Sequence, residues 1–122
     1  MNKPAETRFV TLHHTQKDGS HFDLMILRGE QLATWKFVHP PESGGPVNCE
    51  RLPDHRTMYL DYEGPVSNDR GDVMQHDEGT CTIESWADSR IEINFNGAKL
   101  TGRCTLSHSG PDQPWRFSRL DE

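Results

Sequence analysis

The chain has 122 residues, which is enough for one domain with a buried core. A hydrophobic share of 32% beside 26% charged residues, ten glycines and eight prolines is lean for a helical bundle and typical of a small β-protein. The net charge of −6 argues against a general nucleic-acid coat protein, because non-specific binding to nucleic acid depends on a basic face.

The first third of the chain is predicted to form three short strands. Residues 1–6 are expected to be a loose N-terminus. Alternation of apolar and polar side chains then predicts strands at Arg8–His14, His21–Leu27 and Leu32–Val38, with turns at 15–20 and 28–31. Residues 39–49 hold three prolines and two glycines, which predicts a loop.

The second half is predicted to form a series of short strands separated by glycine-containing turns. The predicted strands are Asp72–His76, Thr80–Trp86, Arg90–Asn96, Ala98–Leu106 and Trp115–Leu120. Asn96-Gly97 is the strongest hairpin signal. The pattern predicts an all-β fold, a small antiparallel β-barrel of about eight strands with long loops, and a single domain over residues 1–122.

The cysteine count and the hydropathy pattern bear on the compartment. Cys49, Cys81 and Cys104 make an odd number with no C-x-x-C pair, which argues against a disulfide framework and a thiolate zinc site. No apolar run reaches the roughly 20 residues of a membrane span, and residues 1–8 are too polar for a signal peptide. The sequence therefore predicts a cytoplasmic protein without a membrane partner.

The second predicted strand carries a candidate metal site. Strand alternation puts His21 and Asp23 on one face, with Met25, and their α-carbons are then roughly 7 Å apart. His14 reaches the same ion from the preceding strand. Imidazole and carboxylate ligands suit manganese, iron or zinc. The alternatives are a solvent-exposed polar face with incidental histidines, and His13 in place of His14.

Trp35 is expected in the core, with stacking on a terminal nucleotide as the other interpretation. Cys104 is expected to be buried.

An ordered set of short motifs covers nearly the whole chain: His14, His21-Phe22-Asp23, Trp35, Asp54-His55, Tyr59, Tyr62-Glu63-Gly64, Asp77-Glu78-Gly79-Thr80, Lys99-Leu100-Thr101-Gly102-Arg103 and Trp115–Leu120. This set resembles the 3′-phosphoesterase domain of bacterial ATP-dependent DNA ligase D and its short stand-alone relatives. The resemblance implies a small β-barrel that binds Mn²⁺ and trims DNA 3′ ends, removing a terminal ribonucleoside and then the remaining 3′-phosphate.

The resemblance also implies roles for individual residues. By position, His14, His21 and Asp23 match the family's metal ligands, and His55 and Tyr59 match its phosphate-contacting pair. In that role the histidine contacts a phosphate or donates a proton to the leaving oxygen, and the tyrosine orients that oxygen. The alternative for His55 and Tyr59 is a structural pair at the edge of the core. This chain departs from the family at Met25, where an arginine that grips the phosphate is expected. It departs again at Leu12, where a glutamine is expected, and the turn between the two histidines is one residue longer.

A phosphate site without that arginine lacks a bidentate clamp. The basic side chains that are candidates to replace it are Lys36, Arg51 and Arg56, and Arg51 is the predicted phosphate-binding residue.

The leading functional hypothesis is a metal-dependent phosphoesterase that heals DNA 3′ ends in end-joining repair, with His55 and Tyr59 as catalytic residues. Mn²⁺ is the expected cofactor, with Zn²⁺ or another divalent metal as the alternative. The expected partners are DNA 3′ ends carrying a phosphate or a terminal ribonucleotide, and a separately encoded ligase and polymerase. Two other interpretations stay open: a catalytically impaired relative that binds a metal or a nucleic-acid end, and a phosphatase of a small metabolite.

Overall fold

The computed structural model describes residues 5–120 and is built almost entirely from strands. Two short 3₁₀ helices, η1 and η2, flank the fourth strand. The elements are β1 (Ala5–Gln16), β2 (Gly19–Arg28), β3 (Gln31–Phe37), η1 (Pro41–Ser43), β4 (Val47–Arg56), η2 (Thr57–Leu60), β5 (Gly64–Pro65), β6 (Asp72–Trp86), β7 (Arg90–Gly97), β8 (Thr101–Ser107) and β9 (Trp115–Arg119). No helix within the described part of the chain is long and apolar enough to cross a membrane.

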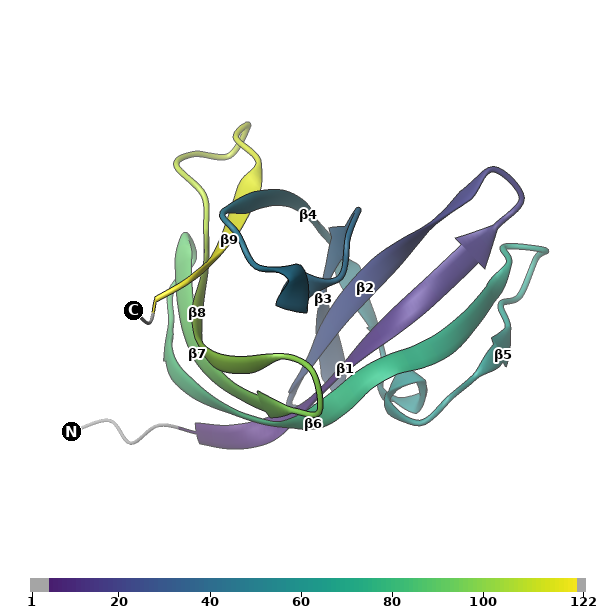
Figure 1. The fold of residues 1–122 in the computed structure, drawn as a ribbon, viewed down its shortest axis with the longest axis horizontal. Coiled ribbons are helices and arrows are strands. Elements are labelled where there is room, and N and C mark those ends of the chain that lie inside the picture. Colours follow the sequence, from purple (N-terminus) through teal and green to yellow (C-terminus); the bar gives the residue numbers. More distant parts are fainter. Residues whose placement is uncertain (1–4, 121–122) are drawn as a thin grey trace.

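Eight of these strands close into an antiparallel barrel (Figure 1). The order around the barrel is β1-β2-β3-β4-β9-β8-β7-β6, and β6 pairs with β1 to close it. The two-residue strand β5 adds to the free part of β6 beyond the barrel wall. The predicted barrel of about eight strands is therefore confirmed.

The barrel interior holds the larger hydrophobic core. Alternate residues of each strand point inward, and their side chains include Phe9, Leu24, Trp35, Phe95 and Phe117. Trp35 is fully buried, and its ring centroid lies 5.5 Å from that of Trp115 in an edge-to-face arrangement. The expected core positions of Trp35 and Cys104 are confirmed.

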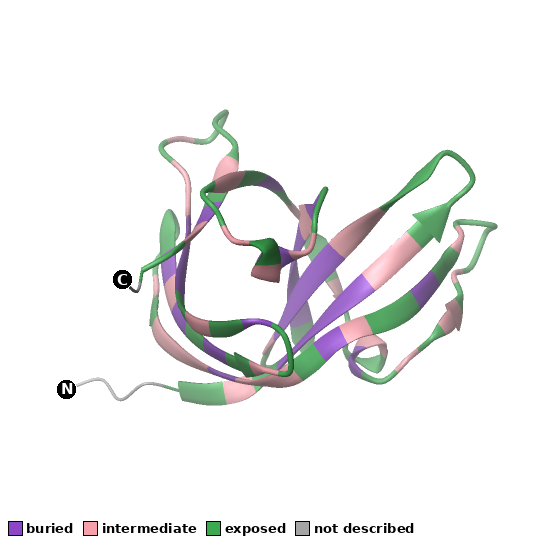
Figure 2. Cartoon of the chain, in the orientation of Figure 1, coloured by how far each residue is buried: buried purple, intermediate pink, exposed green. Residues whose placement is uncertain are grey.

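A second apolar cluster lies on the outer face of β1, β2 and β3. Its buried members are Val10, Leu12, Met25, Leu32, Leu60 and Val73, and Tyr59, Tyr62 and Val66 pack against them. The segment from η2 to β5 supplies several of these residues and so covers the outer face. As a result the middle parts of β1 and β2 are buried on both sides (Figure 2).

Two strand boundaries in the first half of the chain, the starts of β1 and β4, differ from the predicted ones. Ala5 and Glu6 belong to β1, because they pair with Ile83 and Thr82 of β6; residues 1–4 lie outside the described residues. The predicted loop at 39–49 is correct only as far as residue 46. From Val47 the chain is strand, because β9 arrives from the far end of the sequence to pair with it.

The predicted strands Asp72–His76 and Thr80–Trp86 are one continuous strand, β6. Gly79 does not break it. A Cβ on this glycine would meet the carbonyl oxygen of Asn96 at 2.4 Å, so Gly79 allows close approach of β7 to β6. Beside it, the buried Asp77 carboxylate accepts hydrogen bonds from the backbone N–H groups of Ala98, Lys99 and Leu100. These bonds hold the turn between β7 and β8, so β8 begins at Thr101 and not at Ala98.

Candidate metal and phosphate site

Three of the predicted site residues converge on the outer face of the β1–β2 hairpin. His14 of β1 lies directly opposite His21 of β2, and Asp23 is two residues further along β2 on the same face. One nitrogen or carboxylate oxygen from each residue lies within 4.8 Å of the others. His21 Nε2 is 3.1 Å from Asp23 Oδ1, and His14 Nδ1 is 3.7 Å from Asp23 Oδ2.

The burial and the hydrogen bonding of Asp23 show whether this cluster fits a cation. The residue is only 3% exposed, and its Oδ1 atom makes no hydrogen bond among the described residues, although His21 Nε2 lies 3.1 Å away. A buried carboxylate oxygen that makes no hydrogen bond destabilises the fold unless a positive charge lies beside it. Two imidazoles and a carboxylate are ligands that divalent transition metals accept. The donor set therefore fits a divalent metal, and the exposed polar face considered from the sequence is ruled out for Asp23.

The orientation of His14 is fixed from outside the hairpin. Its Nε2 lies 2.6 Å from the backbone carbonyl oxygen of Arg70. A carbonyl only accepts hydrogen bonds, so Nε2 donates, and the lone pair of the neutral ring is on Nδ1, the nitrogen that lies near Asp23. This is the arrangement by which a carbonyl orients a metal-binding histidine.

His13 belongs to the opposite face of β1. Its ring stacks on that of Phe22, with centroids 4.5 Å apart and planes inclined by 9°. Phe22 in turn packs against the barrel core. His14, and not His13, is therefore the histidine of β1 that lies in the cluster.

His55 and Tyr59 approach the cluster from β4 and η2. Their rings meet edge to face with centroids 5.8 Å apart. Both residues line a small pocket of about 30 Å³ together with His14, Asp23 and Met25. His55 Nδ1 lies 2.9 Å from the carbonyl oxygen of Pro53, so Nδ1 donates and Nε2 is the nitrogen available to a ligand. The structure thus brings this pair together with His14 and Asp23 of the cluster, whereas His21 does not line the pocket.

Comparison with known protein families identifies the family to which this chain belongs. Residues 12–108 match the family model described as the DNA ligase D 3′-phosphoesterase domain. The chain belongs to the DNA ligase D 3′-phosphoesterase domain family. This membership gives it a 3′-phosphoesterase-type role in DNA repair, with DNA ends as substrates. No curated protein matches the chain.

Met25 is where this 3′-phosphoesterase domain departs from the expected family pattern. The side chain is only 1% exposed and packs in the outer apolar cluster with Leu12 and Val73. It also lines the small pocket beside Asp23 and His55. The wall that the sequence comparison expected to carry an arginine is therefore apolar.

The structure does not bring Arg51 to this site. Its guanidinium carbon lies 4.5 Å from the ring centroid of Trp35, and its NH2 is 3.3 Å from Asp54 Oδ1. The cause is an irregularity in the pairing of β3 with β4: His55 is opposite Leu32 of the outer cluster, whereas Arg51 is opposite Trp35 of the barrel core.

Two other arginines lie near His55. A hollow of about 560 Å³ adjoins the small pocket, and Arg56 and Arg70 both line it, as do His14, His55 and Tyr59. Lys36, another candidate from the sequence, lines neither the hollow nor the pocket. Arg70 was missed because Asp69-Arg70-Gly71 indicates only a turn; no local signal connects it with a residue of β1.

Proposed function

We propose that this protein is a Mn²⁺-dependent 3′-phosphoesterase that trims DNA 3′ ends, removing a 3′-phosphate or a terminal ribonucleoside before end joining. The observation that carries the proposal is the cluster of His14, His21 and Asp23, two of whose members, His14 and Asp23, share a small pocket with His55. Family membership supports the reaction class and the DNA end. The metal and the exact bond cleaved are part of the proposal.

In this proposal His14 Nδ1, His21 Nε2 and the Asp23 carboxylate hold the metal. Asp23 contributes the negative charge, and the Arg70 carbonyl keeps the His14 ring in the tautomer that presents Nδ1. A divalent cation bound there supplies Lewis-acid polarisation of a phosphoryl oxygen. Mn²⁺ is the metal that the family resemblance implies. A carboxylate and imidazoles without a thiolate are compatible with Mn²⁺ and equally with Zn²⁺ or Fe²⁺, and the buried cysteines lie elsewhere.

His55 and Tyr59 act on the phosphate itself. With Nδ1–H bound to the Pro53 carbonyl, only the protonated His55 ring has a second N–H to donate. That N–H neutralises a phosphate oxygen, or protonates the leaving oxygen as water attacks phosphorus and the P–O bond to that oxygen breaks. The Tyr59 hydroxyl orients the same group by a hydrogen bond.

The test uses two primer–templates, one ending in a 3′-phosphate and one in a single ribonucleotide. Each is incubated with wild-type protein in Mn²⁺, in Zn²⁺ and in chelator. We expect Mn²⁺-dependent loss of the 3′-phosphate and of the ribonucleoside, and none in Asp23→Asn. Asp18→Asn is the matched control, because Asp18 lies in the exposed turn of the same hairpin. Absence of turnover by folded, metal-loaded protein on both ends would contradict the proposal.

A second candidate function is a strand-end-binding relative without catalysis. The buried Met25 favours it, because a phosphate subsite that has lost a guanidinium holds the transition state less tightly than the family pattern predicts. The same assay separates the two candidates. Tight binding of the 3′-phosphate end with no turnover in any metal is the result expected of the binding protein alone.

A further inference from the structure

We propose that Arg70, with Arg56 on the same hollow, forms the phosphate-binding subsite for the DNA strand end, in place of the clamp that is missing at position 25. The inference deepens the proposed function and rests on it for the identity of the ligand. The inference concerns binding and not the chemical reaction: two guanidinium groups bind a nucleic-acid phosphate beside the His14 cluster.

The hollow that Arg70 lines has the right position for a strand end. Its walls come from the last part of β4, from η2 and from residues 66–70, and it adjoins the small pocket through shared residues. The shared residues are His14, His55, Tyr59 and Val66. A strand whose terminal phosphate meets His55 therefore continues into the hollow, where Arg56 and Arg70 lie.

The charge of the hollow is opposite to the charge of the whole chain. The chain carries a net charge of −6, yet Arg56 and Arg70 line the hollow with one carboxylate, that of Asp54. This carboxylate is already paired with Arg51, at 3.3 Å. The hollow is thus locally positive on an acidic protein, and such a focused patch attracts anions. A phosphate is the anion that a DNA end brings.

The turn at residues 67–70 holds the guanidinium of Arg70 in place. Asn68 and Asp69 adopt positive φ angles of 61° and 59°, and Val66 N–H donates to the Gly71 carbonyl at 2.8 Å to close the loop. Arg70 Nε then donates to the carbonyl of Ser67 at 2.9 Å. This bond restrains the side chain while the two terminal nitrogens remain a fork of donors suited to a phosphate.

Arg70 also links the subsite to the metal cluster through its own backbone. Its carbonyl accepts from His14 Nε2, so the guanidinium and the metal-binding histidine are positioned by one residue. A substitution of the side chain alone removes the guanidinium and leaves that carbonyl in place. This separation makes the phosphate role testable without disturbing the metal site.

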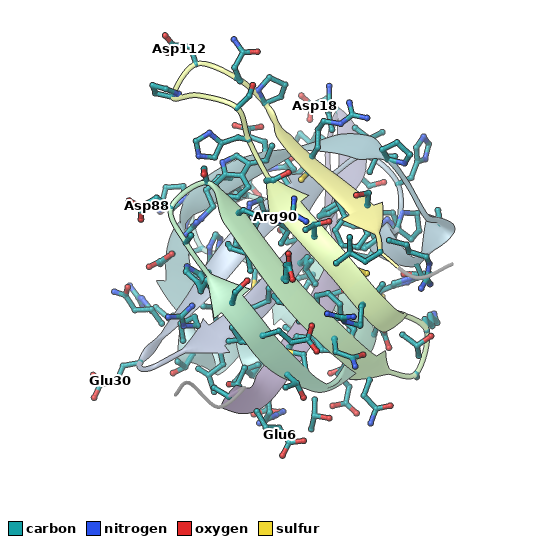
Figure 3. All side chains as sticks on the ribbon, turned by 90° about the vertical axis from the view of Figure 1, so that its left-hand side faces the viewer. Glu6, Asp18, Glu30, Asp88, Arg90 and Asp112 are labelled. Carbon is teal, nitrogen blue, oxygen red and sulfur yellow. The ribbon has the colours of Figure 1, made fainter. Side chains whose placement is uncertain are left out.

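The experiment measures binding of a labelled single-stranded oligonucleotide with a 3′-phosphate by fluorescence anisotropy, in chelator, so that no turnover contributes. Arg70→Gln and Arg56→Gln are compared with Arg90→Gln. Arg90 is an exposed arginine of β7 (Figure 3) that pairs with Glu92 and does not line the hollow. Arg70→Lys tests the need for the fork.

We expect Arg70→Gln to raise Kd roughly tenfold and to lower the slope of log K against log salt by about 0.7. Arg56→Gln is expected to lower the slope similarly, Arg70→Lys to restore the slope but only part of the affinity, and Arg90→Gln to change neither. Mn²⁺ affinity should be unchanged in Arg70→Gln. Wild-type protein that binds the oligonucleotide in chelator but does not turn it over when Mn²⁺ is supplied would contradict the proposed reaction alone. Equal binding by Arg70→Gln and Arg90→Gln, or no binding by wild type, would overturn the phosphate subsite.

Discussion

The backbone carbonyl of Arg70 lies 2.6 Å from Nε2 of His14, a residue 56 positions earlier in the chain. This contact joins the loop between β5 and β6 to the histidine of β1. Because the carbonyl accepts, the neutral His14 ring presents Nδ1 toward Asp23. The loop at 66–71 is therefore part of the candidate metal site, although it contributes none of the candidate ligand atoms.

Gly71 is the residue that lets this loop approach β1, and its substitution tests the contact. Its φ is +91°, and a Cβ here would meet the Thr15 carbonyl oxygen at 2.0 Å. We expect Gly71→Ala to displace the Arg70 carbonyl, to weaken Mn²⁺ binding by about tenfold or more, and to destabilise the fold by about 1–3 kcal/mol. Isothermal titration with Mn²⁺ and denaturant unfolding measure the two effects.

Gly29→Ala is the matched control for that substitution. Gly29 also has a positive φ, +61°, but a Cβ there meets nothing within 4 Å, and the residue lies in the turn between β2 and β3. We expect a loss of about 1–2 kcal/mol from backbone strain alone, with unchanged Mn²⁺ affinity. Equal Mn²⁺ affinities of Gly71→Ala and wild type would show that the Arg70 carbonyl does not orient His14.

The hairpin half of this site was predictable from the sequence, because it depends on local rules. Alternation fixes His21 and Asp23 on one face, and a short turn between two strands brings His14 opposite His21. The second apolar cluster was not predictable in the same way. Met25 lies on the face that alternation assigned to His21 and Asp23, and it is buried with Leu12 because the segment from η2 to β5 folds back over them.

Arg51 and Arg70 show where local rules end. Simple alternation places Arg51 and His55 on the same face of β4, but the irregular pairing with β3 turns Arg51 toward Trp35. Arg70 reaches the site only through a contact between distant parts of the chain, and the partner of His14 is a backbone carbonyl, which carries no side-chain signature. Sequence reasoning thus found the candidate ligands and missed the loop that orients one of them.

Metal binding should stabilise the fold, and it should reverse the sign of the stability difference between wild type and Asp23→Asn. At a free Mn²⁺ concentration one hundred times Kd, binding to the native state alone adds about 2.7 kcal/mol to the free energy of unfolding. We expect a rise in Tm of several degrees for wild type and none for Asp23→Asn. In chelator the order is the opposite, because Asp23→Asn removes a buried charge whose Oδ1 makes no hydrogen bond among the described residues.

Thermal unfolding of the two proteins in Mn²⁺ and in chelator measures all four values. Asp18→Asn serves as the control, because its exposed turn position predicts wild-type Tm under both conditions. The same Mn²⁺-induced shift in Asp23→Asn as in wild type would show that the cation binds elsewhere.

Two buried cysteines predict how stability changes at high pH. Burial raises the pKa of Cys49 to about 12, and burial together with the negative charge of Glu6 raises the pKa of Cys81 to about 12. In the unfolded chain both thiols lose their protons near the ordinary value of 9.0. The stability contributed by the neutral thiols is therefore complete below pH 9 and is lost as the pH rises from 9 toward 12.

Site-resolved alkylation and denaturant unfolding measure these two consequences. At pH 8 we expect Cys49 and Cys81 to react slowly in the native protein and rapidly in denaturant, because the thiolate is the reactive form. The unfolding midpoint should fall between pH 9 and pH 11. Rapid labelling of both thiols in the native protein at pH 8 would contradict the burial that raises their pKa.

Restoring an arginine at position 25 tests whether that position is able to hold the phosphate clamp in this chain. Met25 is buried among Leu12 and Val73, so a guanidinium there loses its water in an apolar cluster, and the nearest charge on the same strand face is Asp23. We expect Met25→Arg to destabilise the fold by about 2–4 kcal/mol and to weaken Mn²⁺ binding, because the guanidinium pairs with the carboxylate that the metal needs.

Met25→Leu, which keeps the volume, should cost less than about 1.5 kcal/mol and leave Mn²⁺ affinity unchanged. Denaturant unfolding and Mn²⁺ titration compare the two. A Met25→Arg protein with wild-type stability and faster turnover would instead show that position 25 accepts the clamp, and that Arg70 is not its replacement.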